Sequence, residues 1–157
     1  MNTDIIEMVA KLNLPFPWET NARGQVIMTP VNYDHGNRVM GLGQALARLA
    51  PEWQMGTELG IVTVDGVKAP DLILASPDYH NRHKGQPGYV TAAPEICVEV
   101  MSFSNSWQEM REKMPLYFEA GALEVWIVDT DGRISFFAPG SEALQQSRLI
   151  PEAPGSI

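Results

Sequence analysis

The sequence predicts a mixed α/β domain, in which a mixed β-sheet is flanked by helices. Apolar residues alternate with period two in several segments and recur with the helical period in two others. In addition, the segment 95–129 contains a strand, a connection over 102–122 and a second strand. That order is typical of a right-handed crossover between parallel strands.

Bulk composition restricts the class of protein. The 157 residues are 45% hydrophobic and 19% charged, which fits one soluble domain over residues 1–157. No apolar run approaches the roughly 20 residues of a membrane span, and residues 1–12 lack the basic start of a signal peptide. The one cysteine, Cys97, excludes an internal disulfide and favours a reducing, cytoplasmic setting. The net charge of −8 argues against a broad basic surface, although bound metal ions can supply local positive charge.

The first half of the chain predicts two helices and two hairpins. We expect a short helix over 3–12 and two short strands in "WETNARGQVIMTP" around a turn that contains Gly24. Apolar residues at helical spacing predict a helix over 35–49, with Asp34 as its N-cap. Asp65-Gly66 is a strong hairpin signal, which predicts strands over 58–64 and 67–76. A polar loop over 77–93 follows.

The second half predicts the crossover and a closing hairpin. After the strand 95–101, Ser106 and Glu109 form a capping-box pattern at the start of a helix that ends near Gly121. Pro115 is expected to kink this helix because it removes a backbone donor. A strand over 123–129 and a turn at Asp131-Gly132 follow, and the tail 139–157 is expected to lie on the surface. Trp107 and Trp126 are expected in the core.

Strand register brings three acids together. A two-residue turn at 65 and 66 pairs Val64 with Val67, which makes Glu58 a diagonal neighbour of Asp71 on the same face. If the strand 95–101 pairs antiparallel with 70–76, with Ala75 opposite Glu95, then Asp71 lies opposite Glu99. Period-two alternation places Glu99 beside Cys97 and Met101, where an unpaired charge is costly to bury.

Two interpretations of these acids remain open. Taken singly, acidic side chains in strands are most often exposed on an open sheet face; Glu95 is expected to be exposed in this way. Taken together, close carboxylates repel, and a hard cation such as Mg²⁺ relieves the repulsion with a few carboxylate oxygens plus water. Glu99 is then a candidate metal ligand.

At these residues the sequence resembles the Uma-two family of restriction-endonuclease-like domains. The resemblance rests on "APDLIL", "EICVEVMSFSNS" and "REKMPLYFEAGALEVWIVD", with "PWE", "MTP" and "DHGNRV" nearer the start, and it covers about residues 15–138. It implies the fold of the PD-(D/E)XK nucleases, in which an Asp and a later acid hold metal. Asp71 and Glu99 match these two acids.

The resemblance also implies further site residues. Nucleases of this fold usually carry Lys two residues after the second acid, where this chain has Met101. The family has a Lys in the following helix instead, and Lys113 matches it, as catalytic base or charge stabiliser. His35 and Glu58 match further polar positions of the family.

The implied function is metal-dependent hydrolysis of nucleic-acid phosphodiesters by an endonuclease that uses Mg²⁺ or Mn²⁺. DNA is the expected substrate, no membrane is involved, and a homodimer is expected by analogy with the fold. The alternative is a catalytically degenerate nuclease-fold domain that binds nucleic acid or a protein partner. Met101 and the net charge of −8 favour that alternative.

Several candidate residues also have plain structural interpretations. His35 at a helix start either positions a water or a carboxylate or is simply a polar residue of the first turn, where the helix dipole disfavours its charged form. Lys113 is an ordinary exposed helix lysine if the family match is set aside. His80 and His83 lack further ligands at zinc-site spacing. Cys97 has no base partner in the sequence and is interpreted as a packing residue.

Overall fold

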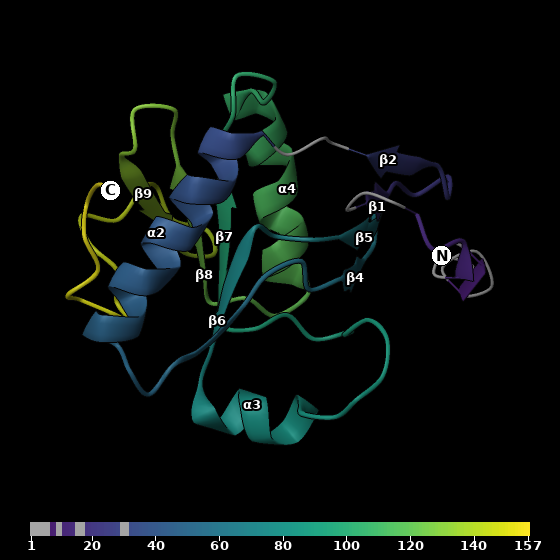
Figure 1. Ribbon diagram of the computed structural model, residues 1–157, viewed down its shortest axis with the longest axis horizontal. Coiled ribbons are helices and arrows are strands. Elements are labelled where there is room, and N and C mark those ends of the chain that lie inside the picture. The colour runs from purple at the N-terminus through teal and green to yellow at the C-terminus, as the bar shows by residue number, and fades with distance from the viewer. Residues whose placement is uncertain (1–6, 9–10, 15–17, 29–31) are drawn as a thin grey trace.

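A five-stranded mixed sheet forms the centre of the protein (Figure 1). The computed structural model describes residues 7–8, 11–14, 18–28 and 32–157. The sheet has the order β3-β6-β7-β8-β9, in which β7 and β8 are parallel and the other neighbours are antiparallel. Its strands are β3 (Gln54–Gly56), β6 (Leu72–Ala75), β7 (Ile96–Val100), β8 (Glu124–Val128) and β9 (Ile134–Phe137). The predicted mixed α/β class is confirmed.

Two helices cover opposite faces of this sheet. Leu42 and Leu46 of α2 (Tyr33–Leu49) pack on the face formed by residues such as Val98 and Trp126. On the other face, α4 (Trp107–Glu119) packs Met110 and Tyr117 against Cys97, Val125 and Ile127. The helix α4 connects the parallel pair β7–β8, as the crossover predicted, and it continues through Pro115 to Glu119. The expected packing roles of Cys97 and Trp126 are confirmed, since both are fully buried.

Two short antiparallel ribbons lie beside the sheet. They are β1 (Trp18–Thr20) with β2 (Val26–Met28), and β4 (Ile61–Thr63) with β5 (Gly66–Lys68). Both hairpins were predicted, but the second turns at Val64-Asp65, because Thr63 and not Val64 is the last paired residue before Gly66. Gly66 has φ of 92°, and a Cβ there would lie 2.3 Å from the carbonyl oxygen of Thr20. A glycine therefore lets the two ribbons approach closely.

The predicted long strand 67–76 is wrong, because it is two strands in two different sheets. β5 ends at Lys68 and β6 begins at Leu72. Pro70 lies between them and has no N–H for a ladder hydrogen bond. On its outer side, β6 pairs antiparallel with β3 and not with the segment 58–64. The strand predicted over 58–64 begins only at Ile61, as β4.

The helix starts differ from prediction in two places. Asn32 and not Asp34 caps α2, with its side chain accepting a hydrogen bond from the backbone N–H of His35. The expected loop over 77–93 contains a helix, α3 (Pro77–His83), which Ser76 caps.

Glu95 is half-buried rather than exposed, because its carboxylate accepts hydrogen bonds from the N–H and hydroxyl of Ser76. The capping box of Ser106 and Glu109 is confirmed.

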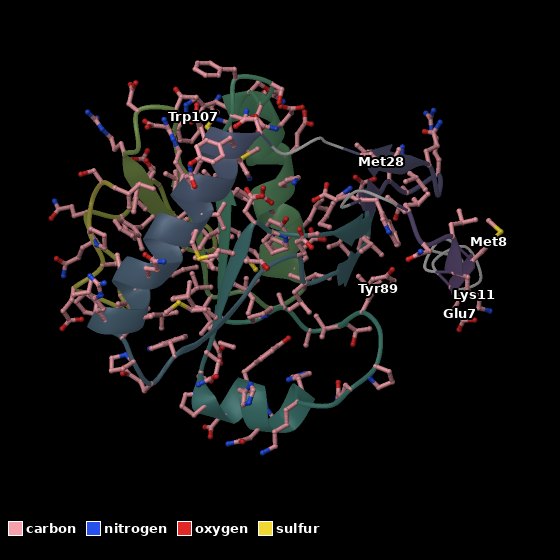
Figure 2. The ribbon with its side chains drawn as sticks, viewed as in Figure 1. Glu7, Met8, Lys11, Met28, Tyr89 and Trp107 are labelled. Atoms are coloured by element: carbon pink, nitrogen blue, oxygen red, sulfur yellow. The ribbon has the colours of Figure 1, made fainter. Side chains whose placement is uncertain are left out.

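Two further expectations are only partly tested or wrong. Residues 7, 8 and 11 are helical, while residues 3–6 and 9–10 of the predicted helix 3–12 lie outside the described residues. Trp107 is not a core residue: it is 37% exposed at the start of α4 (Figure 2). Within the described part of the chain, no helix is long and apolar enough to cross a membrane.

The C-terminal tail is folded into the protein, contrary to the expectation of a surface segment. Ile150 is buried in the core that α2 covers. The tail is attached through Glu124 at the start of β8, which is 1% exposed. Its carboxylate accepts hydrogen bonds from the Ser147 hydroxyl (2.8 Å), the Arg148 N–H (2.7 Å) and the Trp126 indole N–H (2.7 Å). A buried carboxylate requires such donors, and the tail supplies most of them.

We therefore expect Glu124→Gln to destabilise the protein by about 2–5 kcal/mol. The amide replaces one acceptor oxygen with a donor, which leaves two buried donors of this network without acceptors. Urea unfolding monitored by circular dichroism measures the effect. Glu119→Gln, an exposed site on α4, is the matched control. Equal unfolding midpoints for the two variants would show that the Glu124 network contributes little.

Candidate active site

The pairing of β6 with β7 places Asp71 opposite Glu99. The β6–β7 register pairs Leu72 with Val98, and its continuation by one residue sets Asp71 opposite Glu99. The backbone N–H of Val100 donates to Asp71 Oδ2 at 2.7 Å, which fixes the Asp71 carboxylate at the start of β6. The predicted register of this pair is confirmed.

Glu99 is an acid in an apolar surrounding. It is 5% exposed and lies on the face that also holds Cys97 and Met101. Its Oε1 accepts hydrogen bonds from the Lys113 ammonium (3.1 Å) and from the Tyr117 hydroxyl. Burial raises the pKa of Glu99 to about 7, since repulsion by Asp71 and Glu19 adds to burial and Lys113 only partly offsets both.

Lys113 points into the site from α4. Its Nζ lies 3.1 Å from Glu99 Oε1 and 2.8 Å from Glu19 Oε1. Burial disfavours the charged form of Lys113, but the attraction of Glu99 and Glu19 outweighs it and raises the pKa of Lys113 above its usual range. Lys113 is therefore a cation, which favours charge stabilisation over the role of a general base in this state of the site.

Glu19 is a site residue that the sequence analysis missed. It lies on β1, 94 residues before Lys113, and its Oε1 also accepts the Ala69 N–H at 2.9 Å. The ribbon is held in place by Thr20, whose hydroxyl accepts the Val67 N–H and whose carbonyl accepts from the buried Lys68 ammonium. The motif "PWE" was the signal, but the sequence offered no register between the β1–β2 ribbon and α4.

His35 orients Asp71. Its Nε2 lies 3.0 Å from Asp71 Oδ1, in the first turn of α2. The hydrogen bond to Asp71 raises the pKa of His35, with burial acting in the opposite direction. The Asp71 carboxylate therefore acts against the helix dipole, which disfavours the charged form of His35.

Contrary to the prediction, Glu58 lies outside the acid cluster. It lies in the loop between β3 and β4, is exposed, and has φ of 57°. The cause is the break between β5 and β6, which removes the continuous hairpin on which its register was calculated. Glu58 instead lines a cleft that also borders His35 and Asp71.

The two loop histidines form no metal site. Both lie on α3, and His83 Nδ1 is 2.9 Å from the Tyr79 carbonyl oxygen, with its ring stacked on Tyr79. Tyr117 is a polar contact of Glu99 as well as a core residue. Across the residues that the structure describes, no group of three or more His, Cys, Asp and Glu side chains is arranged to hold an ion.

The pair Asp71 and Glu99 nevertheless fits a Mg²⁺-type ion. Mg²⁺ is commonly bound by one or two carboxylates and completes its shell with water and substrate phosphate. Glu99 is a buried acid, and its pKa is raised because the attraction of Lys113 does not offset burial and the repulsion by Asp71 and Glu19. In addition, no described residue donates a hydrogen bond to its Oε2. A cation between the two acids relieves this repulsion.

Removal of the Glu99 charge should change how stability depends on pH. The folded state binds the Glu99 proton more tightly than the unfolded state does. The stability that protonation of Glu99 contributes is therefore fully present below its ordinary pKa of 4.5 and is lost as pH rises through about 7. Without metal, the wild type should lose about 3 kcal/mol relative to Glu99→Gln between these limits. Urea unfolding in EDTA at pH 5 and pH 8 measures it. Parallel pH profiles would contradict the raised pKa.

A family model named Uma2, with the description "Putative restriction endonuclease", matches residues 13–154. The chain belongs to the Uma2 family. The resemblance inferred from the sequence is thereby confirmed. No curated protein sequence matches this Uma2 member.

Among solved structures, this Uma2 member is similar to the crystal structure of a protein from Anabaena variabilis ATCC 29413, described as a "putative nuclease belonging to DUF820". The TM-score is 0.63 at 16% sequence identity, and the match covers 85% of this chain and 80% of that chain. At this identity the similarity shows a shared fold.

Proposed function

We propose that this Uma2 member is a metal-dependent nuclease that hydrolyses phosphodiester bonds in nucleic acid. The observation that carries the proposal is the position of Lys113, whose ammonium lies 3.1 Å from Glu99 Oε1. Met101, two residues after Glu99, cannot carry charge or a proton, and Lys113 supplies a cation at the same acid from α4.

Each residue of the cluster has a role in this proposal. Asp71 and Glu99 would hold Mg²⁺ or Mn²⁺, which would polarise the phosphate and activate water when bound. Lys113 stabilises negative charge that develops on the phosphate oxygens. His35 fixes the orientation of Asp71 through the 3.0 Å contact, and Glu19 and Tyr117 hold Lys113 and Glu99 in place. Glu19, His35 and Tyr117 are therefore positioning residues.

The helix ends near the site suit a phosphate-bearing polymer. The amino ends of α2 and α4 and the carboxyl end of β7 lie at the same end of the sheet (Figure 1). Helix amino ends favour anionic groups. DNA remains the expected substrate, in a cytoplasmic setting that the buried thiol of Cys97 fits. Homodimer formation remains an expectation from analogy with the fold.

The alternative proposal is a degenerate domain that binds without cleavage. The observation in its favour is that the Lys113 ammonium bridges Glu99 and Glu19 directly, so the acids are neutralised in part without an ion. The net charge of −8 also gives little general attraction for nucleic acid.

Nicking of supercoiled plasmid separates the two proposals. The nuclease proposal predicts open-circular product in Mg²⁺ or Mn²⁺ and none in EDTA. Single-stranded DNA and RNA are tested under the same conditions to define the substrate. An absence of cleavage of all three with either metal, by protein that is folded by circular dichroism, would favour the degenerate domain.

A further inference from the structure

A cleft of about 590 Å³ adjoins the acid cluster and has no role in the mechanism above. It lies between α2 and the segments that carry β3 and the start of β6. Asp71 and His35 border it, so the cleft is continuous with the proposed metal site. A volume of this size is within the range of small-molecule binding sites.

The cleft wall is mainly apolar. It is formed by seven aliphatic, thioether or proline side chains, Leu72 among them, together with three glycines that leave room along α2 and β3: Gly36, Gly43 and Gly56. Such a wall suits the faces of a flat, uncharged ring, because apolar and π surfaces are both favourably removed from water there.

The polar groups of the cleft favour hydrogen-bond donors. Two carboxylates, Glu58 and Asp71, and the amide of Gln44 lie in its lining. No Lys or Arg is among the described residues that line it, and the one basic side chain there, His35, is already paired with Asp71, so a phosphate would meet the two carboxylates with no free cation. An amino group that donates hydrogen bonds to a carboxylate is the complementary chemistry.

We propose that this cleft binds an unpaired nucleobase bearing an exocyclic amino group, beside the phosphodiester held at Asp71 and Glu99. The inference rests on the proposed nuclease function and specifies its substrate class. A paired base in a duplex is stacked and has its amino group engaged, so the base must come from a single strand or leave the stack. Glu58 accepts from the amino group, in the manner that carboxylates accept from the cytosine N4 amino group.

Nucleosides test the cleft without any phosphodiester. Deoxycytidine, which has an amino group, and thymidine, which has none, are titrated into ¹⁵N-labelled wild-type protein without metal. The expected result is that deoxycytidine shifts the amide signals of Gly36 and Gly56, which line the cleft. The affinity for deoxycytidine should be at least about five times that for thymidine, because a good carboxylate–amino contact discriminates at that level.

Two variants and a matched control assign the site. In Glu58→Gln, the affinity for deoxycytidine should fall to within about twofold of that for thymidine, because the charged acceptor is gone. Gly43→Leu should abolish the shifts by filling the cleft; a Cβ there meets only Leu72 Cδ1, at 3.8 Å, an ordinary contact, and circular dichroism checks that the variant is folded. Gly41→Leu is the control on the same helix, with open space around its Cβ and no place in the cleft lining.

Several results would overturn the inference: shifts confined to residues outside the cleft, equal affinities for the two nucleosides, or unchanged binding in Gly43→Leu. These outcomes are independent of cleavage. Plasmid nicking without nucleoside binding would remove the cleft inference and leave the nuclease proposal. Nucleoside binding without metal-dependent cleavage would remove the nuclease proposal and leave a base-binding cleft.

Discussion

Replacement of Lys113 by Met is expected to slow metal-dependent cleavage by roughly 10²–10³-fold, the loss typical of removing one group that stabilises transition-state charge. Met is similar in length to Lys but has no charge, so the substitution removes the cation that lies 3.1 Å from Glu99 Oε1. No other Lys or Arg among the described residues makes an ion pair with Glu99. The rate is measured as initial velocity of plasmid nicking at saturating Mn²⁺.

Controls separate this effect from loss of the fold. Lys113→Met leaves Glu99 and Glu19 without their cation, so the variant should unfold at a lower temperature. Rates are therefore compared at a temperature at which circular dichroism shows both proteins folded, and Mn²⁺ affinity should be retained. Lys84→Met changes an exposed lysine beyond the end of α3 and should cleave normally. Full activity in Lys113→Met would remove Lys113 from the mechanism.

Asp71→Asn is expected to abolish Mn²⁺ binding in isothermal titration calorimetry and cleavage with it. The amide keeps the shape of the carboxylate and one acceptor oxygen, so hydrogen bonding to His35 or Val100 is partly preserved. The negative charge that attracts a divalent cation is lost, and an amide is a weak ligand for Mg²⁺ and Mn²⁺. Wild-type protein should bind Mn²⁺ with a measurable heat under the same conditions.

Asp78→Asn is the matched control for this substitution. Asp78 is an exposed acid in the first turn of α3 and takes no part in the acid cluster. This variant should bind Mn²⁺ as the wild type does. If Asp71→Asn also binds Mn²⁺ unchanged, the ion lies elsewhere and the assignment of Asp71 as a ligand is wrong.

The pair at the centre of the site could be predicted because it depends on local pattern. The alternation of apolar residues in "PEICVEVMSF" fixes the face of Glu99, and pairing of β6 with β7 then sets Asp71 opposite. The capping box of Ser106 and Glu109 likewise fixes the start of α4. Period and capping are properties of adjacent residues, so one sequence contains them.

Features that depend on long-range packing were missed. Glu58 was misplaced because Pro70 interrupts the hairpin, and strand parity alone does not reveal that interruption. Glu19 reaches Lys113 only because Gly66 and Thr20 dock one ribbon on another. The tail joins the core because buried Glu124 requires donors that Ser147 and Arg148 supply. None of these contacts leaves a periodic signal.

The location of a bound divalent ion is the most direct test of the central claim, that Asp71 and Glu99 form a metal centre. Crystals of the wild-type protein soaked in Mn²⁺ would be measured at a wavelength where manganese scatters anomalously. The predicted result is an anomalous peak between the carboxylates of Asp71 and Glu99, with Lys113 beside it. A peak bound by other residues, or no peak at the pair in crystals with Mn²⁺ in excess, would contradict the metal-dependent nuclease.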